Sequence, residues 1–202
     1  MTDRRGVLRA SAALATLPGV LAGCVSGGSG SDASTASAPT TVSPTAGFTL
    51  ESPAFEDGAT IPTRYTADGE DLSPPLTVAG VPEAAGSLAL VVDDPDAPGS
   101  GSFEHWLLWN VPPETDRLPE GINQSRRVPD LGDARQGTNG FGELGYRGPR
   151  PPKADGPHTY RFTLFAVTAP LNVQAGARYP TLDRALVDSV VATARLTGSY
   201  DR

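Results

Sequence analysis

The chain has 202 residues, enough for one domain of ordinary size with an N-terminal extension, and its formal net charge is −7. This acidic balance argues against a general nucleic-acid-binding protein, because such a protein needs a basic face. Its 23 glycines and 20 prolines favour strands joined by structured loops, and its single cysteine excludes an internal disulfide framework.

The first 23 residues have the features of an export signal. Paired arginines at positions 4 and 5 precede an apolar, alanine-rich segment, residues 7–22, which is too short and too interrupted to span a bilayer. The segment ends in Leu21-Ala22-Gly23-Cys24, which resembles a lipobox, and the paired arginines resemble a twin-arginine signal. We therefore expect an exported lipoprotein, anchored through lipidated Cys24 on the outer side of the cytoplasmic membrane. A plain signal peptide and an uncleaved anchor with an incidental cysteine are the alternatives.

Residues 26–46 consist almost entirely of Ser, Gly, Thr, Ala and Pro, a composition typical of a flexible spacer. The expected organisation is therefore an export signal with a lipobox over residues 1–23, a lipidated cysteine with its spacer over residues 24–46, and one folded domain over residues 47–202. This last part is long enough to bury a hydrophobic core.

The folded domain begins with short predicted strands and then carries longer apolar runs. Asp-Gly pairs at positions 57–58 and 68–69 mark turns. The apolar character is continuous over residues 88–92 and 106–111, as in central strands of a sheet that is covered on both faces. Strands are predicted at Phe48–Leu50, Thr60–Ala67, Leu76–Val78, Leu88–Val92, Trp106–Val111 and His158–Val167.

The remaining segments complete a mainly β inventory. Residues 112–133 show no periodicity and are predicted to form a long loop, whereas Thr181 can cap a helix that runs to about Ala192. A closing strand is predicted at Ala194–Tyr200. Many strands, one C-terminal helix and long structured loops predict a β-sandwich of antiparallel-rich sheets.

Charged groups gather at the ends of the predicted core strands. Asp94 and Asp96 follow one apolar run and His105 begins the next, while His158 begins the clearest strand and shares a face with Tyr160. Charges at the rim of a core must be paired, hydrated or engaged with a ligand. Two imidazoles and a phenol, oriented by carboxylates, would bind a small anion.

Two further features of this group matter for its geometry. Strict alternation along its strand predicts that His105 shares a face with Leu107 and Trp109. Each histidine, taken by itself, is also compatible with an ordinary hydrogen-bonded residue at a strand boundary.

Other chemistries fit the sequence less well. The two histidines, Asp94 and Asp96 are ligand types for zinc or iron, but His-x-His and His-Glu-x-x-His spacings are absent, so we expect no metal and no other cofactor. Residues 140–145 match G-x-G-x-x-G, yet the prolines that follow cannot continue the helix of a dinucleotide site. This loop either directs backbone N–H groups at an anion or merely turns a corner. Because no G-x-S-x-G motif marks a nucleophile, we expect that the protein is not an enzyme.

Four motifs occur in a specific order: Asp94-Pro95-Asp96-Ala97-Pro98, then residues 105–112, then residues 140–152, then Gly156-Pro157-His158-x-Tyr160-x-Phe162. In this order and spacing the chain resembles the phosphatidylethanolamine-binding protein (PEBP) family, in particular its prokaryotic Raf kinase inhibitor-like (YbhB/YbcL) branch, over residues 48–200. The resemblance implies a β-sandwich with a small pocket that accepts phosphate-like anions or phosphorylated head groups.

The resemblance also implies a set of ligand-binding residues, and the chain departs from the animal members of the family in two respects. Arg150 stands where animal relatives tend to carry a small residue, and a long cation there would alter the pocket mouth or add an anion contact. The long C-terminal helix of the animal members is not apparent after Tyr200. The positions that match the family's pocket motifs are Asp94, Asp96, Pro98, His105, Gly148, His158 and Tyr160.

These observations lead to one principal hypothesis, a non-catalytic, membrane-tethered binding module for a small anionic ligand, phosphate-like or phosphorylated. His105, His158 and Tyr160 would donate to the anion, and Asp94 with Asp96 would orient the imidazoles. One alternative is an inhibitor or regulator of a kinase or protease that acts through the pocket and its loops. A hydrolase is the weaker alternative.

Overall fold

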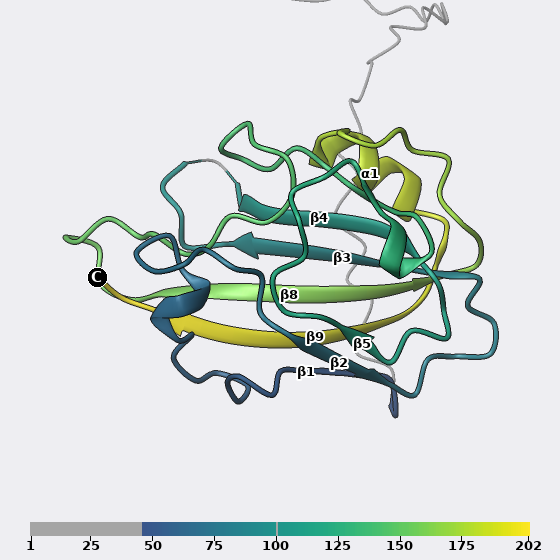
Figure 1. Ribbon diagram of the computed structural model, residues 1–202, viewed down its shortest axis with the longest axis horizontal. Coiled ribbons are helices and arrows are strands. Elements are labelled where there is room, and N and C mark those ends of the chain that lie inside the picture. Colours follow the sequence, from purple (N-terminus) through teal and green to yellow (C-terminus); the bar gives the residue numbers. More distant parts are fainter. Residues whose placement is uncertain (1–45, 100) are drawn as a thin grey trace, which may run out of the picture. The chain divides into compact units, whose positions relative to one another are not determined.

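Two antiparallel sheets form the framework of the computed structural model, which describes residues 46–99 and 101–202 (Figure 1). The smaller sheet has the strand order β1-β2-β5 and the larger has the order β6-β7-β4-β3-β8-β9. The antiparallel pairings confirm the predicted fold class. The strands are β1 (Thr49–Glu51), β2 (Leu76–Ala79), β3 (Ser87–Asp94), β4 (Phe103–Val111), β5 (Arg117–Leu118), β6 (Arg127–Val128), β7 (Ala134–Gln136), β8 (His158–Val167) and β9 (Val190–Tyr200).

Strand β3 is buried along its whole length, because both faces of the larger sheet are covered. Leu88, Leu90 and Val92 join a core that includes the smaller sheet, whereas Ala89 and Val91 join a second core that includes residues of the helix α1 (Tyr179–Leu186). This two-sided burial confirms what the continuous apolar pattern predicted.

The C-terminal helix is shorter than predicted and begins earlier. Helix α1 starts at Tyr179, with Pro180 in its first turn, so that Thr181 lies inside the helix and does not cap it. Proline is favoured in this first turn because its missing N–H would have no partner there. The helix ends at Leu186, well before Ala192, because the β-branched Val190 and Val191 begin β9.

Two other sequence predictions differ from the structure. Residues 60–67 form no strand; they contain a 3₁₀ helix, Thr63–Tyr65, which follows Pro62, a residue without a backbone N–H for a ladder. The predicted loop of residues 112–133 contains β5, β6 and a second 3₁₀ helix, Pro129–Leu131. Strands of two residues carry no readable periodicity, so the sequence could not reveal them.

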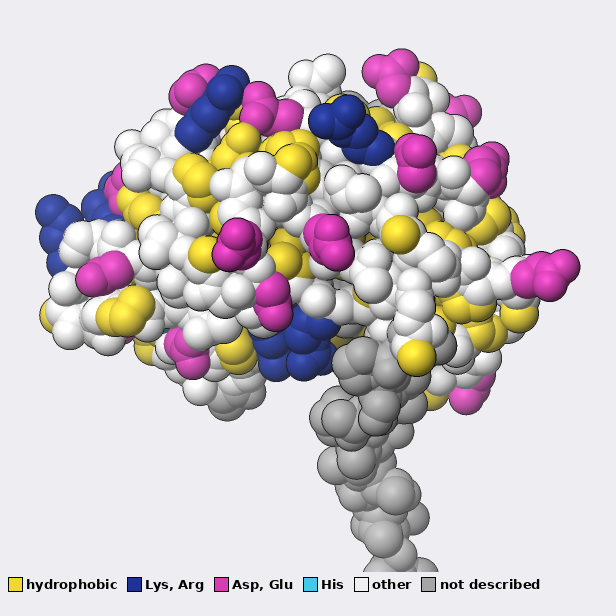
Figure 2. Space-filling view, turned by 90° about the horizontal axis from the view of Figure 1, so that it is seen from below, with side chains coloured by type: hydrophobic (Ala, Val, Ile, Leu, Met, Phe, Trp, Pro, Cys, Tyr) yellow, Lys and Arg dark blue, Asp and Glu magenta, His cyan; other side chains and the backbone are white. Residues whose placement is uncertain are grey.

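The predicted export signal, Cys24 and most of the spacer lie outside the described residues. Within residues 46–99 and 101–202, none of the helices is long and apolar enough to cross a membrane. Acidic side chains are scattered over the face shown in Figure 2, in keeping with the negative net charge.

Candidate functional site

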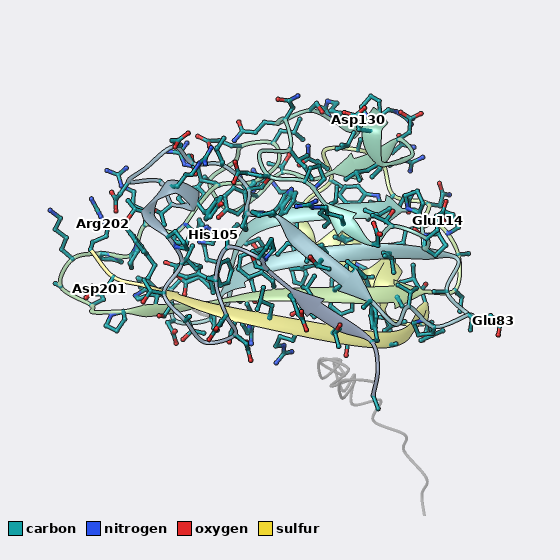
Figure 3. The ribbon with its side chains drawn as sticks, turned by 60° about the horizontal axis from the view of Figure 1, so that its bottom comes forward. Glu83, His105, Glu114, Asp130, Asp201 and Arg202 are labelled. Atoms are coloured by element: carbon teal, nitrogen blue, oxygen red, sulfur yellow. The ribbon has the colours of Figure 1, made fainter. Side chains whose placement is uncertain are left out.

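A cavity of about 240 Å³ lies where β3, β4 and β8 meet the loops at one end of the larger sheet. Five of the seven predicted ligand-binding residues line it, namely Asp94, Pro98, His105, His158 and Tyr160. The other lining residues are Ala97, Phe103, Phe141, Arg150, Pro151 and Pro152. His105 lies toward the end of the domain that carries Arg202, away from Glu83 and Glu114 (Figure 3).

A β-bulge in β4 turns His105 into this cavity. Val92 pairs with Trp106 and Asp93 pairs with Glu104, so His105 is an extra residue without a partner in β3. Such an extra residue breaks the alternation of side chains between the two faces of a sheet. The prediction that His105 shares a face with Leu107 and Trp109 is therefore wrong, because those residues belong to the core on the opposite face.

The bulged residue is held by a reciprocal pair of contacts with Arg147. The backbone N–H of Arg147 donates to the carbonyl of His105 at 2.9 Å, and His105 Nδ1 lies 2.6 Å from the carbonyl oxygen of Arg147. A carbonyl only accepts, so Nδ1 carries the proton and Nε2 is the second nitrogen. Burial lowers the pKa of His105, and the carbonyl and nearby carboxylates of Asp94, Asp93 and Asp71 only partly oppose this.

His158 is fixed by Asp94 in a similar way. Its Nδ1 lies 2.8 Å from Asp94 Oδ2, and both side chains are almost fully buried. The carboxylate therefore selects the tautomer with the proton on Nδ1, as predicted for an orienting carboxylate. The second nitrogen, Nε2, lies 4.0 Å from Asp155 Oδ2, a distance too long for a hydrogen bond.

Tyr160 carries a buried hydroxyl without a hydrogen bond of normal geometry. Its side chain is only 1% exposed, and its Oη is unique among the buried side-chain polar atoms of the described residues in lacking such a bond, although the Asp94 carboxylate and the Arg150 backbone lie near it. Burial first, and then the nearby Asp94 carboxylate, raise the pKa of Tyr160, so the hydroxyl keeps its proton. Its ring packs edge-on against His105 with centroids 5.1 Å apart. The cavity wall therefore contains a phenol hydroxyl that has no normal hydrogen bond within the protein.

Asp96 and Gly148, the other two predicted residues, do not line the cavity. The Asp96 carboxylate accepts the backbone N–H of Thr159 at 2.8 Å, so it positions the start of β8. The Gly148 backbone N–H donates to Asp71 Oδ1 at 2.7 Å, and a Cβ at Gly148 would lie 2.5 Å from the carbonyl oxygen of Tyr65. Asp96 and Gly148 therefore hold neighbouring backbone segments in place, and neither lines the cavity.

The glycine-rich loop contributes a side chain and not its backbone. Asn139 Oδ1 accepts the N–H groups of Phe141 and Glu143, and the N–H of Gly142 donates to the Asn139 carbonyl. These groups are occupied within the loop, so the corner-turning alternative describes it better than an anion-binding backbone. The Phe141 ring is 46% exposed and packs against Phe103 and His105 at the cavity.

Three of these features were not identified from the sequence. Phe103, Phe141 and the Arg147 carbonyl shape the cavity. Phe141 and Arg147 lie inside the third motif, residues 140–152, and Phe103 lies two residues before the second, but the sequence assigned no role at the site to any of them. The part of the chain that the structure describes contains no group of three His, Cys, Asp or Glu residues able to hold a metal ion.

Comparison with known proteins places this geometry in context. A family model described as phosphatidylethanolamine-binding protein matches residues 51–201. A UPF0098 protein of Methanothermobacter thermautotrophicus is 45% identical over 153 residues, covering 76% of this chain and 98% of the relative. A Mycobacterium tuberculosis protein named "Putative lipoprotein LppC" is 36% identical over 191 residues, covering 90% of each chain. The crystal structure of Escherichia coli YbcL, described as a new member of the mammalian PEBP family, superposes with a TM-score of 0.71 and 33% identity, covering 78% of this chain and 99% of YbcL.

The unpartnered hydroxyl predicts opposite stability effects for two buried tyrosines. Tyr146 is as buried as Tyr160, but its hydroxyl donates to the Tyr65 carbonyl at 2.6 Å. Tyr160→Phe should leave the free energy of unfolding unchanged or raise it by up to about 1 kcal/mol, whereas Tyr146→Phe should lower it by about 1–2 kcal/mol. Urea denaturation of both variants measures the difference. Equal destabilisation by the two substitutions would mean that the Tyr160 hydroxyl has a partner after all.

Proposed function

The chain belongs to the phosphatidylethanolamine-binding protein family, in its YbhB/YbcL-like prokaryotic branch, and we propose that its cavity binds a small phosphate-like anion without catalysing a reaction. The buried Tyr160 hydroxyl carries the proposal, because a buried donor without a partner costs free energy unless a ligand accepts from it. A cavity of about 240 Å³ suits a phosphate or a small head group, since it is smaller than a typical pocket for a drug-sized molecule.

The two imidazoles make this binding dependent on protons. The Nδ1 proton of each ring is already directed at an acceptor, the Arg147 carbonyl for His105 and the Asp94 carboxylate for His158. A neutral imidazole with its proton on Nδ1 offers only a lone pair at Nε2. An anion therefore gains a donor from either ring only when that ring takes up a second proton.

We further propose that the domain is held at the membrane by lipidated Cys24, on the outer side of the cytoplasmic membrane. The relative from Mycobacterium tuberculosis supports this proposal by its name and by the extent of the match. A match over 90% of the chain must extend into the first 45 residues, because residues 46–202 are 157 of the 202 residues.

Titration with inorganic phosphate tests the binding function. The chain has two histidines, so the ring signals of His105 and His158 can be followed individually by NMR. We expect saturable shifts of both in the wild type, and an affinity at least about tenfold lower in Tyr160→Phe, which loses one hydrogen bond to a charged oxygen. Tyr146→Phe is the matched control and should bind as the wild type does.

Two outcomes would contradict this function. If neither imidazole responds to millimolar phosphate, the cavity is not an anion site. If the purified wild type hydrolyses generic phosphate or carboxylate esters and His105→Ala does not, the protein is a hydrolase.

Anion affinity should rise as the pH falls. Burial lowers the pKa of His105 from 6.5, so the free protein carries this imidazole neutral at pH 7. A bound anion raises the pKa of the imidazole, so binding takes up a proton between the two values. Affinity for sulfate, which stays doubly charged throughout, should therefore increase by up to about tenfold per pH unit as the pH falls below the raised pKa of the anion-bound imidazole, and level off below the lowered pKa of the free imidazole. Calorimetry in buffers of different ionisation enthalpy measures the proton uptake. A sulfate affinity that does not change with pH would refute the proposed coupling between protonation and anion binding.

Lipidation predicts a specific fractionation pattern. When the full-length chain is expressed in a host that processes lipoproteins, the wild type should sediment with membranes and its mature N-terminus should be an acylated Cys24. Cys24→Ala should leave the protein unacylated, and Ser26→Ala, the control, should not change the wild-type result. Mass spectrometry that finds residues 1–23 still attached would rule out the proposed anchor.

A further inference from the structure

The structure places Arg150 in the cavity wall. Its backbone is fixed between Pro149 and Pro151, which are both buried, and the Pro149 carbonyl accepts the N–H of Ala67 at 3.0 Å. Its side chain is 52% exposed. A long cation therefore projects from a rigid base at the cavity.

The guanidinium of Arg150 is loosely held by its carboxylate partner. Its Nε lies 3.8 Å from Asp68 Oδ1, whereas Arg202 Nε lies 2.9 Å from Asp68 Oδ2 and the Tyr200 hydroxyl donates to the same oxygen at 3.3 Å. Exposed ion pairs contribute little to stability. Because Arg202 and Tyr200 continue to compensate Asp68, the Arg150 side chain can leave it for an anion at low cost.

The charges of the cavity wall give Arg150 a particular role. Among the described lining residues, Asp94 is a carboxylate, the two imidazoles need an added proton to become cations, and Arg150 is charged at all relevant pH values. The planar guanidinium also presents paired donors that match two oxygens of a phosphate. Arg150 is thus the permanent cation available to an anion that enters the cavity.

Phosphate monoesters and diesters differ in how many terminal oxygens they offer to the imidazoles, the Tyr160 hydroxyl and the Arg150 guanidinium. A phosphate diester has two terminal oxygens and one charge, which the imidazoles, once they have taken up a second proton, and the Tyr160 hydroxyl can satisfy. A phosphate monoester has three terminal oxygens and, above its second pKa of about 6, two charges. The third oxygen and the second charge are what a guanidinium at the mouth of the cavity can bind.

We propose that Arg150 makes this cavity selective for the dianion of a phosphate monoester over a phosphate diester. The inference rests on the proposed anion-binding function and names its ligand class. On binding, the guanidinium exchanges Asp68 for the terminal oxygens of the monoester, and Arg202 keeps Asp68 paired.

Calorimetric titration of the full-length chain with methyl phosphate and dimethyl phosphate tests this selectivity at about pH 7, where most of the methyl phosphate is the dianion. The wild type should bind methyl phosphate at least about tenfold more tightly, since a charge-assisted bidentate contact is added. Arg150→Ala should remove this preference by weakening methyl phosphate alone, and Arg150→Lys should retain part of it. Arg202→Ala should weaken methyl phosphate a few-fold, because Asp68 then competes for Arg150.

Arg64→Ala is the matched control. Arg64 has a comparably exposed side chain, 49%, and also pairs with carboxylates, but it does not line the cavity, so the wild-type preference should persist. An Arg150→Ala variant that keeps the wild-type preference overturns the selectivity proposal. Equal binding of both esters by the wild type also overturns it while leaving the anion-binding function intact. Failure to bind either ester refutes the anion-binding function itself.

Discussion

The β-bulge in β4 is the constraint on which the site depends. With regular pairing, His105 would point toward α1 with Leu107 and Trp109, and the cavity would have one imidazole. The bulge places His105 beside Tyr160 instead. It is stabilised from outside the sheet, because Gly140 donates its N–H to the Glu104 carbonyl and Arg147 pairs with His105 through both backbone groups. The glycine-rich loop therefore matters mainly because it docks on the bulged strand; a Cβ at Gly140 would come within 2.6 Å of the Phe103 ring.

The polar groups that line the interior of the cavity lower the free energy of unfolding of the domain. If selection acted on folding alone, apolar groups would replace the unpartnered phenol of Tyr160, the buried imidazole of His105 and the buried carboxylate of Asp94. Elsewhere among residues 46–99 and 101–202, the buried side-chain polar atoms have hydrogen-bond partners. Gln136, for example, accepts from the Trp106 indole and donates to the Asn123 and Ser125 carbonyls. The contrast locates the functional site more specifically than the size of the cavity does, since structured domains tolerate such defects where a ligand relieves them.

The sequence predicted the fold class, the two-sided burial of β3 and β4, and β8 with its exact ends, because long apolar or alternating runs have strong periodicity. It also brought Asp94, His105, His158 and Tyr160 to one site, first through their positions at the ends of predicted core strands and then through the family resemblance. It could not predict the bulge, which depends on how residues 137–147 dock on β4, nor the role of Asp96, whose carboxylate binds a backbone group of β8. The short strands were missed because tertiary contacts, and not a local pattern, determine them. The early start of α1 was missed because Pro180 favours the first turn of a helix there.

The family name therefore says less about the ligand than the cavity wall does. A fold supplies a scaffold, and the site residues decide what it binds. In the proposed anion site, two imidazoles with their Nδ1 protons already engaged would contribute to binding only after protonation, whereas Arg150 would contribute its charge without it. A site of this composition would favour an anion with a high charge and several terminal oxygens. The lipid head group in the family name is a diester in its parent phospholipid, with one charge on its phosphate, so a chain with arginine at position 150 should prefer a different phosphate from the one that named the family.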